Sequence, residues 1–574
     1  MKGDFTRSTF DQKKHYSSIR MQQGRVQLDA DWNEQSDITS HHIQTQGRAV
    51  IGLCGAPIKG GGFKIDPTGD NKNLKISPGI IYVDGILCEN DSEITIDHQD
   101  DLPDFELNGN EGVYLAYLDV WQRHITTLED PDIREVALGG PDTTSRIKTV
   151  WQVKLFRVGE SEESVNCLGL DEWEELIAPS TGMLNARSNP GDVPEGPCVM
   201  PPGAGYRRLE NQLYRVEIHK GGQPGTATFK CSRDNGIVAA LWLEKHDNDL
   251  TVSTIDRDES LGFSSGQWVE LTDDTHELNG IPGTLVKLDT VDGQILTIDP
   301  TTATGPVERA DFPGNPRIRR WDCDGEVTVE IPDINDGYIP LEDGVEVRFE
   351  EGTYKTGDYW LIPARTAKGD IEWPRDEEMK PLAQLPHGIE HHYCRLALLG
   401  LKKVGGEEPI ENNWTHLSDC RRIFPAVTEL TSLFYVSGDG QEAMPGEVLP
   451  GELIVGVANG QWPVGGATVR FKIIKGSGNL KSDDQNGPSI EPATEDNGLA
   501  ACTWELDDVN DNQQVEAILL DDAGHPIHIP IRFNANLSKA SGVAYDPQQC
   551  SYLRNLDVKT VQDAIDELCN YTEP

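Results

Sequence analysis

The stretch LKISPGIIYVDGILCEN, residues 74–90, gives the clearest indication of the fold. Apolar residues alternate with polar ones, and the alternation breaks at Pro78-Gly79 and at Asp84-Gly85. Alternation with a period of two is typical of strands that bury one face, and Asp-Gly is a favoured hairpin turn. The stretch therefore predicts a series of short β-hairpins.

Similar patterns on both sides extend this prediction over most of the chain. Residues 113–120 and 149–158 are strand-like, and short alternating runs recur from residue 213 to residue 319, separated by Gly and Asp. The 574 residues include 57 Gly and 35 Pro, which suit many short strands joined by turns, and 12 Trp, which suit packed cores. We predict a mainly β, multidomain protein built from short-strand sandwiches and barrels, with an N-terminal docking helix and a short C-terminal helix.

Residues 429–537 form a second run of evenly spaced strands, whose number and turn spacing predict a β-sandwich. The run resembles a bacterial immunoglobulin-like domain of the invasin and intimin type. The residues expected to face its core are Leu453, Val455, Val457, Val469, Phe471, Ile473, Ala501, Trp504 and Leu506.

The length of the chain predicts several domains. We expect a docking segment at 1–55, a β domain with hairpins at 56–160, an excursion rich in Pro, Gly and Glu at 161–205, a β-rich barrel or sandwich domain at 206–425, the immunoglobulin-like domain at 429–537 and a helical tail at 540–574.

The stretch MQQGRVQLDADWNEQ, residues 21–35, combines a glycine turn, a short alternating segment and a helix start. An exposed Trp32 is costly, and Asp31 and Asn33 can cap backbone donors. Terminal segments are normally frayed and polar, so a segment this specific favours docking on another protein, although the first strand and helix of a globular domain fit equally well. The predicted docking residues are Arg25, Gln27, Leu28, Asp31, Trp32 and Asn33.

The tail predicts one short amphipathic helix. Thr560 and Asp563 approximate a capping box, and the apolar residues that follow share one helical face. A helix of about ten residues is marginal alone, so it packs on its own domain or, as we favour, on copies of itself. The predicted self-association residues are Val561, Ala564, Ile565 and Leu568.

Charge and cysteine usage limit the partners and the compartment. With 96 Asp and Glu against 50 Lys and Arg, the net charge of −46 argues against nucleic-acid or membrane-surface binding. No apolar run is long enough for a membrane span, and none resembling a signal peptide follows Met1. The 11 Cys show no C-x-x-C spacing, which predicts reduced thiols in a protein assembled in the cytoplasm.

One motif suggests catalysis. His387, Glu390 and His391 match the inverted zinc-peptidase pattern, which requires all three residues on one helix. Pro386 and Gly388 break any helix there, and a strand-like run follows. We therefore expect hydrogen-bonded histidines in a protein that is not an enzyme, with no catalytic residue, cofactor or metal.

Several long stretches resemble a family of large bacterial proteins encoded beside contractile, phage-tail-like injection systems. They are the opening residues 1–35, LAYLDVWQRHITTLEDPDIREVALGGPDTTSRIKTVWQV at 115–153, LYRVEIHKGG at 213–222, FKCSRDNG at 229–236 and GDYWLIPARTAKGDIEWP at 357–374. The resemblance implies a structural component of the baseplate region, with baseplate or sheath proteins as partners. It also implies a homo-oligomer related to a trimer or hexamer, built into a particle in the cytoplasm.

The leading hypothesis is a structural protein that docks through its N-terminal segment and projects its β domains as a cage, spacer or fibre. The alternative is a carbohydrate-binding or carbohydrate-cleaving receptor or tail-fibre protein of the same particle. Exposed Trp residues in a cleft with carboxylates would favour the alternative, and buried ones would count against it. The Trp residues in question are Trp242, Trp268, Trp321, Trp360 and Trp373.

Overall fold

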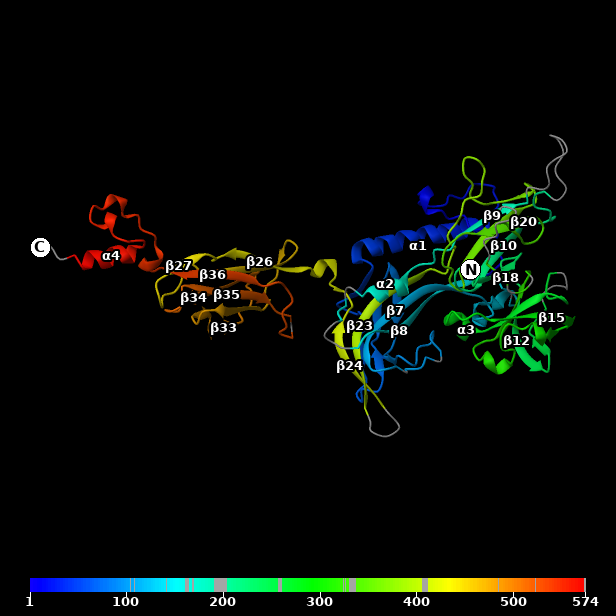
Figure 1. Cartoon of the computed structure of the whole chain (residues 1–574), viewed down its shortest axis with the longest axis horizontal. Coiled ribbons are helices and arrows are strands. Elements are labelled where there is room, and N and C mark those ends of the chain that lie inside the picture. The colour runs from blue at the N-terminus through cyan, green and yellow to red at the C-terminus, as the bar shows by residue number, and fades with distance from the viewer. Residues whose placement is uncertain are drawn as a thin grey trace. The chain divides into compact units, whose positions relative to one another are not determined.

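The computed structural model divides into two compact units, Met1–Phe424 (unit 1) and Pro425–Pro574 (unit 2), and most of its regular structure is β (Figure 1). In the described residues, no helix is both long and apolar enough to cross a bilayer. The structure describes all residues except 104, 108, 141, 161–164, 168, 169, 190–203, 256–260, 324, 326, 330–336, 405–410, 484, 522 and 572–574.

The longest strands of unit 1 form an antiparallel sheet in the order β24-β23-β7-β8. Their bounds are Gly112–Ile125 (β7), Arg146–Gly159 (β8), His391–Val404 (β23) and Glu411–Asp419 (β24). Two segments that the sequence analysis assigned to different domains therefore share one sheet.

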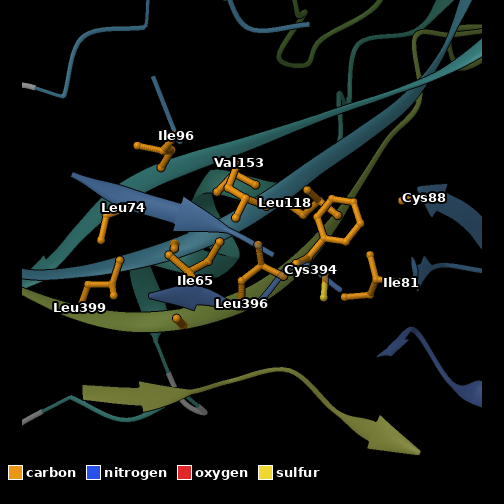
Figure 2. Packing of buried hydrophobic residues seen from close by; sticks show 14 of the residues in the cluster. Ile65, Leu74, Ile81, Cys88, Ile96, Leu118, Val153, Cys394, Leu396 and Leu399 are labelled. Atoms are coloured by element: carbon orange, nitrogen blue, oxygen red, sulfur yellow. The ribbon is translucent and has the colours of Figure 1, made fainter. Parts of the chain in front are cut away.

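The predicted hairpin is present, with β4 (Gly79–Val83) and β5 (Ile86–Asn90) joined at Asp84 and Gly85. Around it lie β1 (Cys54–Pro57), β2 (Ile65–Pro67), β3 (Leu74–Ile76), β6 (Ile94–Thr95) and β25 (Ile423–Phe424). Buried side chains from β1 to β5, β7, β8, β23 and β24 form one core (Figure 2). This core includes Ile65, Leu74, Ile81, Cys88, Leu118, Val153, Leu396 and Leu399.

Six strands of unit 1 close into a small barrel in the order β12-β13-β16-β15-β14-β17. They are β12 (Ala239–His246), β13 (Asp249–Val252), β14 (Trp268–Thr272), β15 (Thr284–Asp292), β16 (Ile295–Asp299) and β17 (Arg317–Trp321). A five-stranded sheet contains β10 (Gln212–Lys220), β11 (Thr228–Ser232), β18 (Val327–Thr328), β21 (Tyr359–Arg365) and β22 (Asp370–Ile371). A three-stranded sheet contains β9 (Leu184–Ser188), β19 (Ile339–Pro340) and β20 (Val345–Phe349).

The barrel meets the five-stranded sheet through a buried ionic cluster. Lys230 Nζ on β11 lies 2.5 Å from the Glu270 carboxylate on β14 and 3.3 Å from the Glu217 carboxylate on β10. Burial alone would raise the pKa of Glu270, but the cations Lys230 and Lys2 outweigh it and lower the pKa to about 2. Lys230 pairs with both Glu217 and Glu270, so the cluster connects the barrel to the five-stranded sheet. Removing one of these buried charges would leave another charge without its partner.

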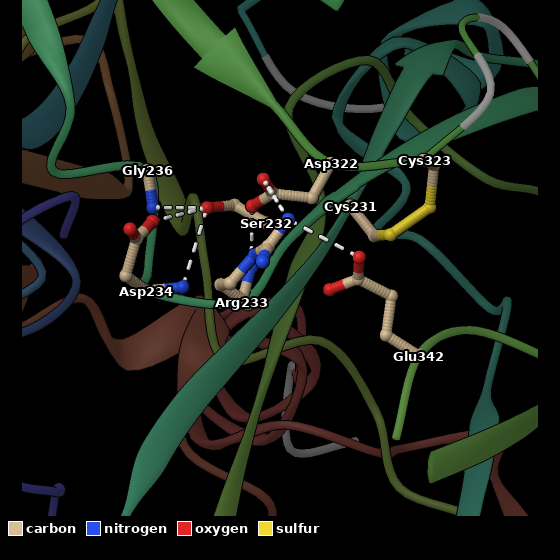
Figure 3. Close-up of a disulfide and its surroundings, with 8 residues drawn as sticks. All are labelled: Cys231, Ser232, Arg233, Asp234, Gly236, Asp322, Cys323 and Glu342. Carbon is tan, nitrogen blue, oxygen red and sulfur yellow. Dashed lines mark hydrogen bonds and ion pairs between the residues drawn. A yellow bond between two sulfur atoms is a disulfide. The ribbon is translucent and has the colours of Figure 1, made fainter. Parts of the chain in front are cut away.

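Two disulfides correct the prediction that the cysteines are reduced. Cys167 bonds Cys420 across 253 residues, and Cys231 bonds Cys323 across 92 residues (Figure 3). Cys231 lies on β11, and the other three cysteines lie outside the strands. Each bond joins residues far apart in the chain, so no short spacing signals the bonds in the sequence. The free cysteines among the described residues are Cys54, Cys88, Cys394, Cys502, Cys550 and Cys569.

The predicted excursion at 161–205 contains a short helix, α2 (Asp171–Ile177), and the strand β9. Its residues 161–164, 168, 169 and 190–203 lie outside the described part of the chain. The helix α3 (Asp274–Leu278) follows β14 in the barrel region.

Unit 2 contains two sheets around one core, in the orders β26-β28-β34-β31-β32 and β27-β36-β35-β30-β33. Of the residues expected to face the core, Ala501 is wrong, because β34 buries Ala500 and Cys502 instead. Ile473 is only partly buried, and the other seven are buried. The strands are β26 (Thr431–Ser437), β27 (Gln441–Ala443), β28 (Leu453–Asn459), β29 (Trp462–Pro463), β30 (Val469–Lys475), β31 (Asn479–Ser482), β32 (Gln485–Gly487), β33 (Ser489–Ile490), β34 (Leu499–Glu505), β35 (Asn512–Leu519) and β36 (Ile531–Leu537).

Candidate docking surfaces

The start of the predicted docking segment contacts its own unit. Lys2 Nζ lies 3.3 Å from the buried carboxylate of Glu217, and Asn235 Nδ2 donates to the Gly3 carbonyl at 2.9 Å. These contacts occupy the first residues of segment 1–55, which therefore are not free to meet a neighbour. The surface available for docking begins further along the chain.

The helix α1 (Asp29–Ile51) is fixed at its start by the segment that precedes it. Thr6 donates to the Asp29 carboxylate from its backbone at 2.8 Å and from its hydroxyl at 2.5 Å. Burial alone would raise the pKa of Asp29, but these hydrogen bonds from Thr6 lower it. Asp31 and Asn33 lie inside the helix after the N-cap residue Leu28, so they do not cap it as expected.

The C-terminal half of α1 rests on the turn between β4 and β5. Arg48 Nε lies 2.5 Å from the Asp84 carboxylate, which also lies 2.8 Å from His392 Nδ1 on β23. Charge-assisted contacts of this kind fix the rotation of the helix about its own axis.

The predicted docking residues differ in how far they reach solvent. Trp32 is 70% exposed and Leu28 is 47% exposed, whereas Ala30 and Ile38 face the body of unit 1 and are buried. Arg25 and Gln27 are exposed, and Asp31 and Asn33 are half-buried. The apolar centre of the predicted site is therefore open to a partner.

Sequence reasoning missed two further residues on the outer face of α1. Ile43 and Val50 are 63% and 68% exposed, and they follow Trp32 by eleven and eighteen residues. These spacings correspond to whole helical turns, so the three side chains lie in one line. Their regular spacing was the available signal, although the polar residues between them obscured it.

The tail helix α4 (Val561–Cys569) has the predicted capping box. Asp563 N donates to Thr560 Oγ1 at 3.1 Å, and Thr560 N donates to the Asp563 carboxylate at 2.8 Å. Ala564 packs in a small core of unit 2 with Leu553 and Val558, so its predicted place in a self-association face is wrong. Of the other predicted self-association residues, Val561 is half-buried, and Ile565 and Leu568 are 45% and 50% exposed.

The histidine motif does not form a chelating pair. His387 Nδ1 accepts a hydrogen bond from Leu361 N at 2.9 Å, and His391 Nδ1 lies 2.7 Å from the Asp119 carboxylate. Burial lowers the pKa of His387 to about 4, and β23 begins at His391, so no helix carries the motif. In the part of the chain that the structure describes, no three His, Cys, Asp or Glu side chains gather as a metal site.

A surface pocket of about 450 Å³ lies beside β5 and β8. Trp151 forms part of its wall, and the Trp151 indole nitrogen donates to the Glu89 carbonyl at 2.9 Å. Its other polar lining residues include Asn90, Asp91, Asp100, Asp101 and Lys148. Of the Trp residues considered for sugar stacking, Trp242, Trp321, Trp360 and Trp373 are buried and Trp268 is half-buried.

The features of unit 1 define a mainly β protein of several small sheets with one long outer helix. The chain belongs to DUF6519, a family of unknown function whose model matches residues 1–171 and 176–426. The match includes α1 and nearly all of unit 1, and it ends where unit 2 begins. No curated protein matches the chain.

Solved structures share little with the chain. The native conformation of E. coli α-2-macroglobulin is 10% identical with a TM-score of 0.15, and the match covers 83% of this chain and 31% of that one. A Ca²⁺-stabilised adhesin with which an Antarctic bacterium binds ice is 11% identical with a TM-score of 0.13, and the match covers 58% and 91% of the two chains. A putative membrane anchored protein from Corynebacterium diphtheriae is 10% identical with a TM-score of 0.13, covering 75% and 97%. TM-scores this low carry no argument.

Proposed function

We propose that this protein is a non-enzymatic structural component of a contractile, phage-tail-like injection particle. It docks on the baseplate region through the segment that contains Leu28 and Trp32, and it projects its β domains as a cage, spacer or fibre. The observation that carries the proposal is the 70% exposure of Trp32 on a helix that is otherwise fixed to its unit. A large apolar side chain held in solvent is typical of an interaction site.

Unit 2 supplies the second part of the proposal. Its two sheets around one core suit an immunoglobulin-like spacer, and α4 would join copies by burying Ile565 and Leu568. Contacts repeated by the symmetry of a trimer or hexamer would make assembly tight although each contact is small.

Assembly would take place in the cytoplasm, with the cysteines still reduced. Disulfides persist in oxidising surroundings, so Cys167–Cys420 and Cys231–Cys323 would close after the particle leaves the cytoplasm.

Particle incorporation tests the proposal directly. Trp32→Asp should leave unit 1 folded but remove the protein from purified particles, because a carboxylate cannot replace the indole that docking would bury. Thr45→Asp, at an exposed position on another side of α1, adds the same charge and should keep the normal copy number. A normal copy number for Trp32→Asp would refute the docking role.

A carbohydrate-binding receptor of the same particle is the second candidate. The half-buried Trp151 beside carboxylates in a surface pocket supports it, and the burial of Trp242, Trp321, Trp360 and Trp373 counts against it. Titration of the protein with a panel of soluble oligosaccharides, followed by tryptophan fluorescence, tests this role. Binding that Trp151→Ala abolishes would support the receptor role, and an unchanged signal with every oligosaccharide would count against it.

A further inference from the structure

The solvent face of α1 carries an apolar stripe. Trp32, Ile43 and Val50 are between 63% and 70% exposed, and at 3.6 residues per turn they lie within about 20° of one another around the helix. Ala30 and Ile38, on the other side, are buried against unit 1. A helix that turns apolar side chains outward while its inner face is already packed presents a surface for a partner.

The spacing along the stripe fits a second helix. From residue 32 to residue 50 the positions on this face are separated alternately by four and three residues, which is the spacing of a coiled-coil seam. The seam positions are Trp32, Ser36, Thr39, Ile43, Gln46 and Val50.

The two hydroxyls in the seam are already satisfied. Ser36 Oγ donates to the Trp32 carbonyl at 3.3 Å, and Thr39 Oγ1 donates to the Gln35 carbonyl at 2.9 Å. A partner can therefore cover both hydroxyls without leaving either of these two donors unpaired.

The distribution of charged residues on α1 indicates which kind of helix can pair with its exposed face. The positions that flank the seam contain no Asp, Glu, Lys or Arg, whereas Glu34 and Asp37 lie on the half-buried side of α1. Two chains of net charge −46 repel one another over most of their surface, and an uncharged strip is where two copies can meet. The flanking residues are Asn33, Gln35, Ser40, His42, Gly47 and Ala49. Two of them already contact their own unit, because Gln35 accepts a hydrogen bond from Ile19 N at 2.8 Å and Gly47 lies against Gly85.

We infer that α1 pairs in an antiparallel direction with α1 of a second copy, about a two-fold axis beside residue 41. The inference rests on the proposed function in one respect, because it names the partner that covers Trp32. In the baseplate region that partner is another copy of this chain and not a different baseplate protein. In this pairing Trp32 faces Val50 of the second copy, Ser36 faces Gln46 of the second copy, and Thr39 faces Ile43 of the second copy.

Each facing pair joins a larger side chain to a smaller one, which is the condition for even packing. A parallel pair would instead set Trp32 against Trp32 and Ser36 against Ser36, which crowds one layer and leaves another empty. The antiparallel direction also opposes the two helix dipoles. Leu28 before the helix and Leu53 after it, 47% and 67% exposed, extend the contact at both ends.

The molecular mass of the full chain in solution tests the pairing. Ile565→Ser with Leu568→Ser, made together as a background, removes the two exposed apolar residues through which α4 is proposed to join copies. The background protein should sediment as a dimer, and adding Ile43→Asp should halve the mass. Adding Thr45→Asp instead should leave the dimer intact.

Two pairs of charged substitutions test whether the two α1 helices run antiparallel. In the antiparallel pair, Ser36→Lys with Gln46→Glu sets opposite charges across the seam twice and keeps the dimer, while Ser36→Lys with Gln46→Lys sets like charges together and dissociates it. A parallel pair would be weakened by both variants. A monomeric background protein would overturn the inference, and so would equal weakening by the two variants. Neither result depends on particle incorporation, so failure of the proposed function remains a separate outcome.

Discussion

Gly47 of α1 and Gly85 of the β4–β5 turn lie backbone against backbone. A Cβ atom on Gly47 would lie 3.1 Å from the Gly85 Cα, and a Cβ atom on Gly85 would lie 2.1 Å from the carbonyl oxygen of Gln44. With the ion pair between Arg48 and Asp84, this contact fixes the C-terminal half of the helix. It therefore determines which face of α1 points to solvent.

Gly85→Ala should release this half of the helix. Gly85 has a φ of +82°, and a methyl group there also overlaps the Gln44 carbonyl, so the loss in unfolding free energy should exceed the roughly 1–3 kcal/mol of backbone strain alone. Gly266→Ala is the matched control, because Gly266 has a φ of +83° and no atom within 4 Å of the new Cβ. Denaturant unfolding and amide hydrogen exchange of α1 measure the difference, and equal losses for both variants would contradict the role of the contact.

Glu270 should make unit 1 sensitive to acid. The pKa of Glu270 is about 2 in the folded chain against 4.5 for the free group. Its contribution to the free energy of unfolding is therefore present above about pH 4.5 and is lost as the pH falls toward 2. Glu270→Gln should cost about 3–5 kcal/mol at neutral pH, since it leaves Lys230 short of a partner, and should flatten the pH dependence in that window.

Glu308→Gln serves as the control for this measurement. Glu308 forms a surface ion pair with Lys245, and such a pair contributes only about 0–1 kcal/mol. Chemical unfolding at a series of pH values measures the free energy of unfolding of both variants. If this free energy changed with pH in Glu270→Gln as steeply as in the wild-type chain, the prediction would be contradicted.

The two disulfides predict a difference between protein inside and outside the cell. Alkylation without reduction should label Cys167, Cys420, Cys231 and Cys323 in protein taken rapidly from the cytoplasm, and should leave them unlabelled in released particles. Mass spectrometry of the alkylated peptides gives the answer. Labelled cysteines in released particles would show that the bonds do not form.

The exposed residues of α4 predict a change in oligomer size. Ile565→Ser with Leu568→Ser should lower the mass of the full chain in solution, because these side chains are the free apolar residues of the helix. Glu567→Gln changes a neighbouring polar residue and should leave the mass unchanged. Light scattering after size-exclusion chromatography measures both variants, and the same mass for both would exclude self-association through α4.

Local sequence patterns predicted the features that are determined by residues close together in the chain. The hairpin around Asp84 and Gly85, the strands that became β7 and β8, and the capping box at Thr560 all follow from periodicity and turn chemistry. Register was less certain. Ala500 rather than Ala501 faces the core, because side chains alternate along β34 and the buried Trp504 lies on the same face as Ala500.

Local sequence patterns could not predict contacts between residues that lie far apart in the chain. The pairing of β7 with β23 and the bond between Cys167 and Cys420 join segments that lie far apart in the chain. The orientation of α1 was hidden for a related reason. Its inner face is selected by the approach of Gly47 to Gly85 and not by an apolar stripe, so the apolar stripe could point outward.

Averaged images of the injection particle test the central claim most directly. Particles from cells that lack this protein should lose density at the baseplate region, and the wild-type chain should restore that density while Trp32→Asp should not. Indistinguishable images with and without the protein would contradict its role as a structural component of the particle.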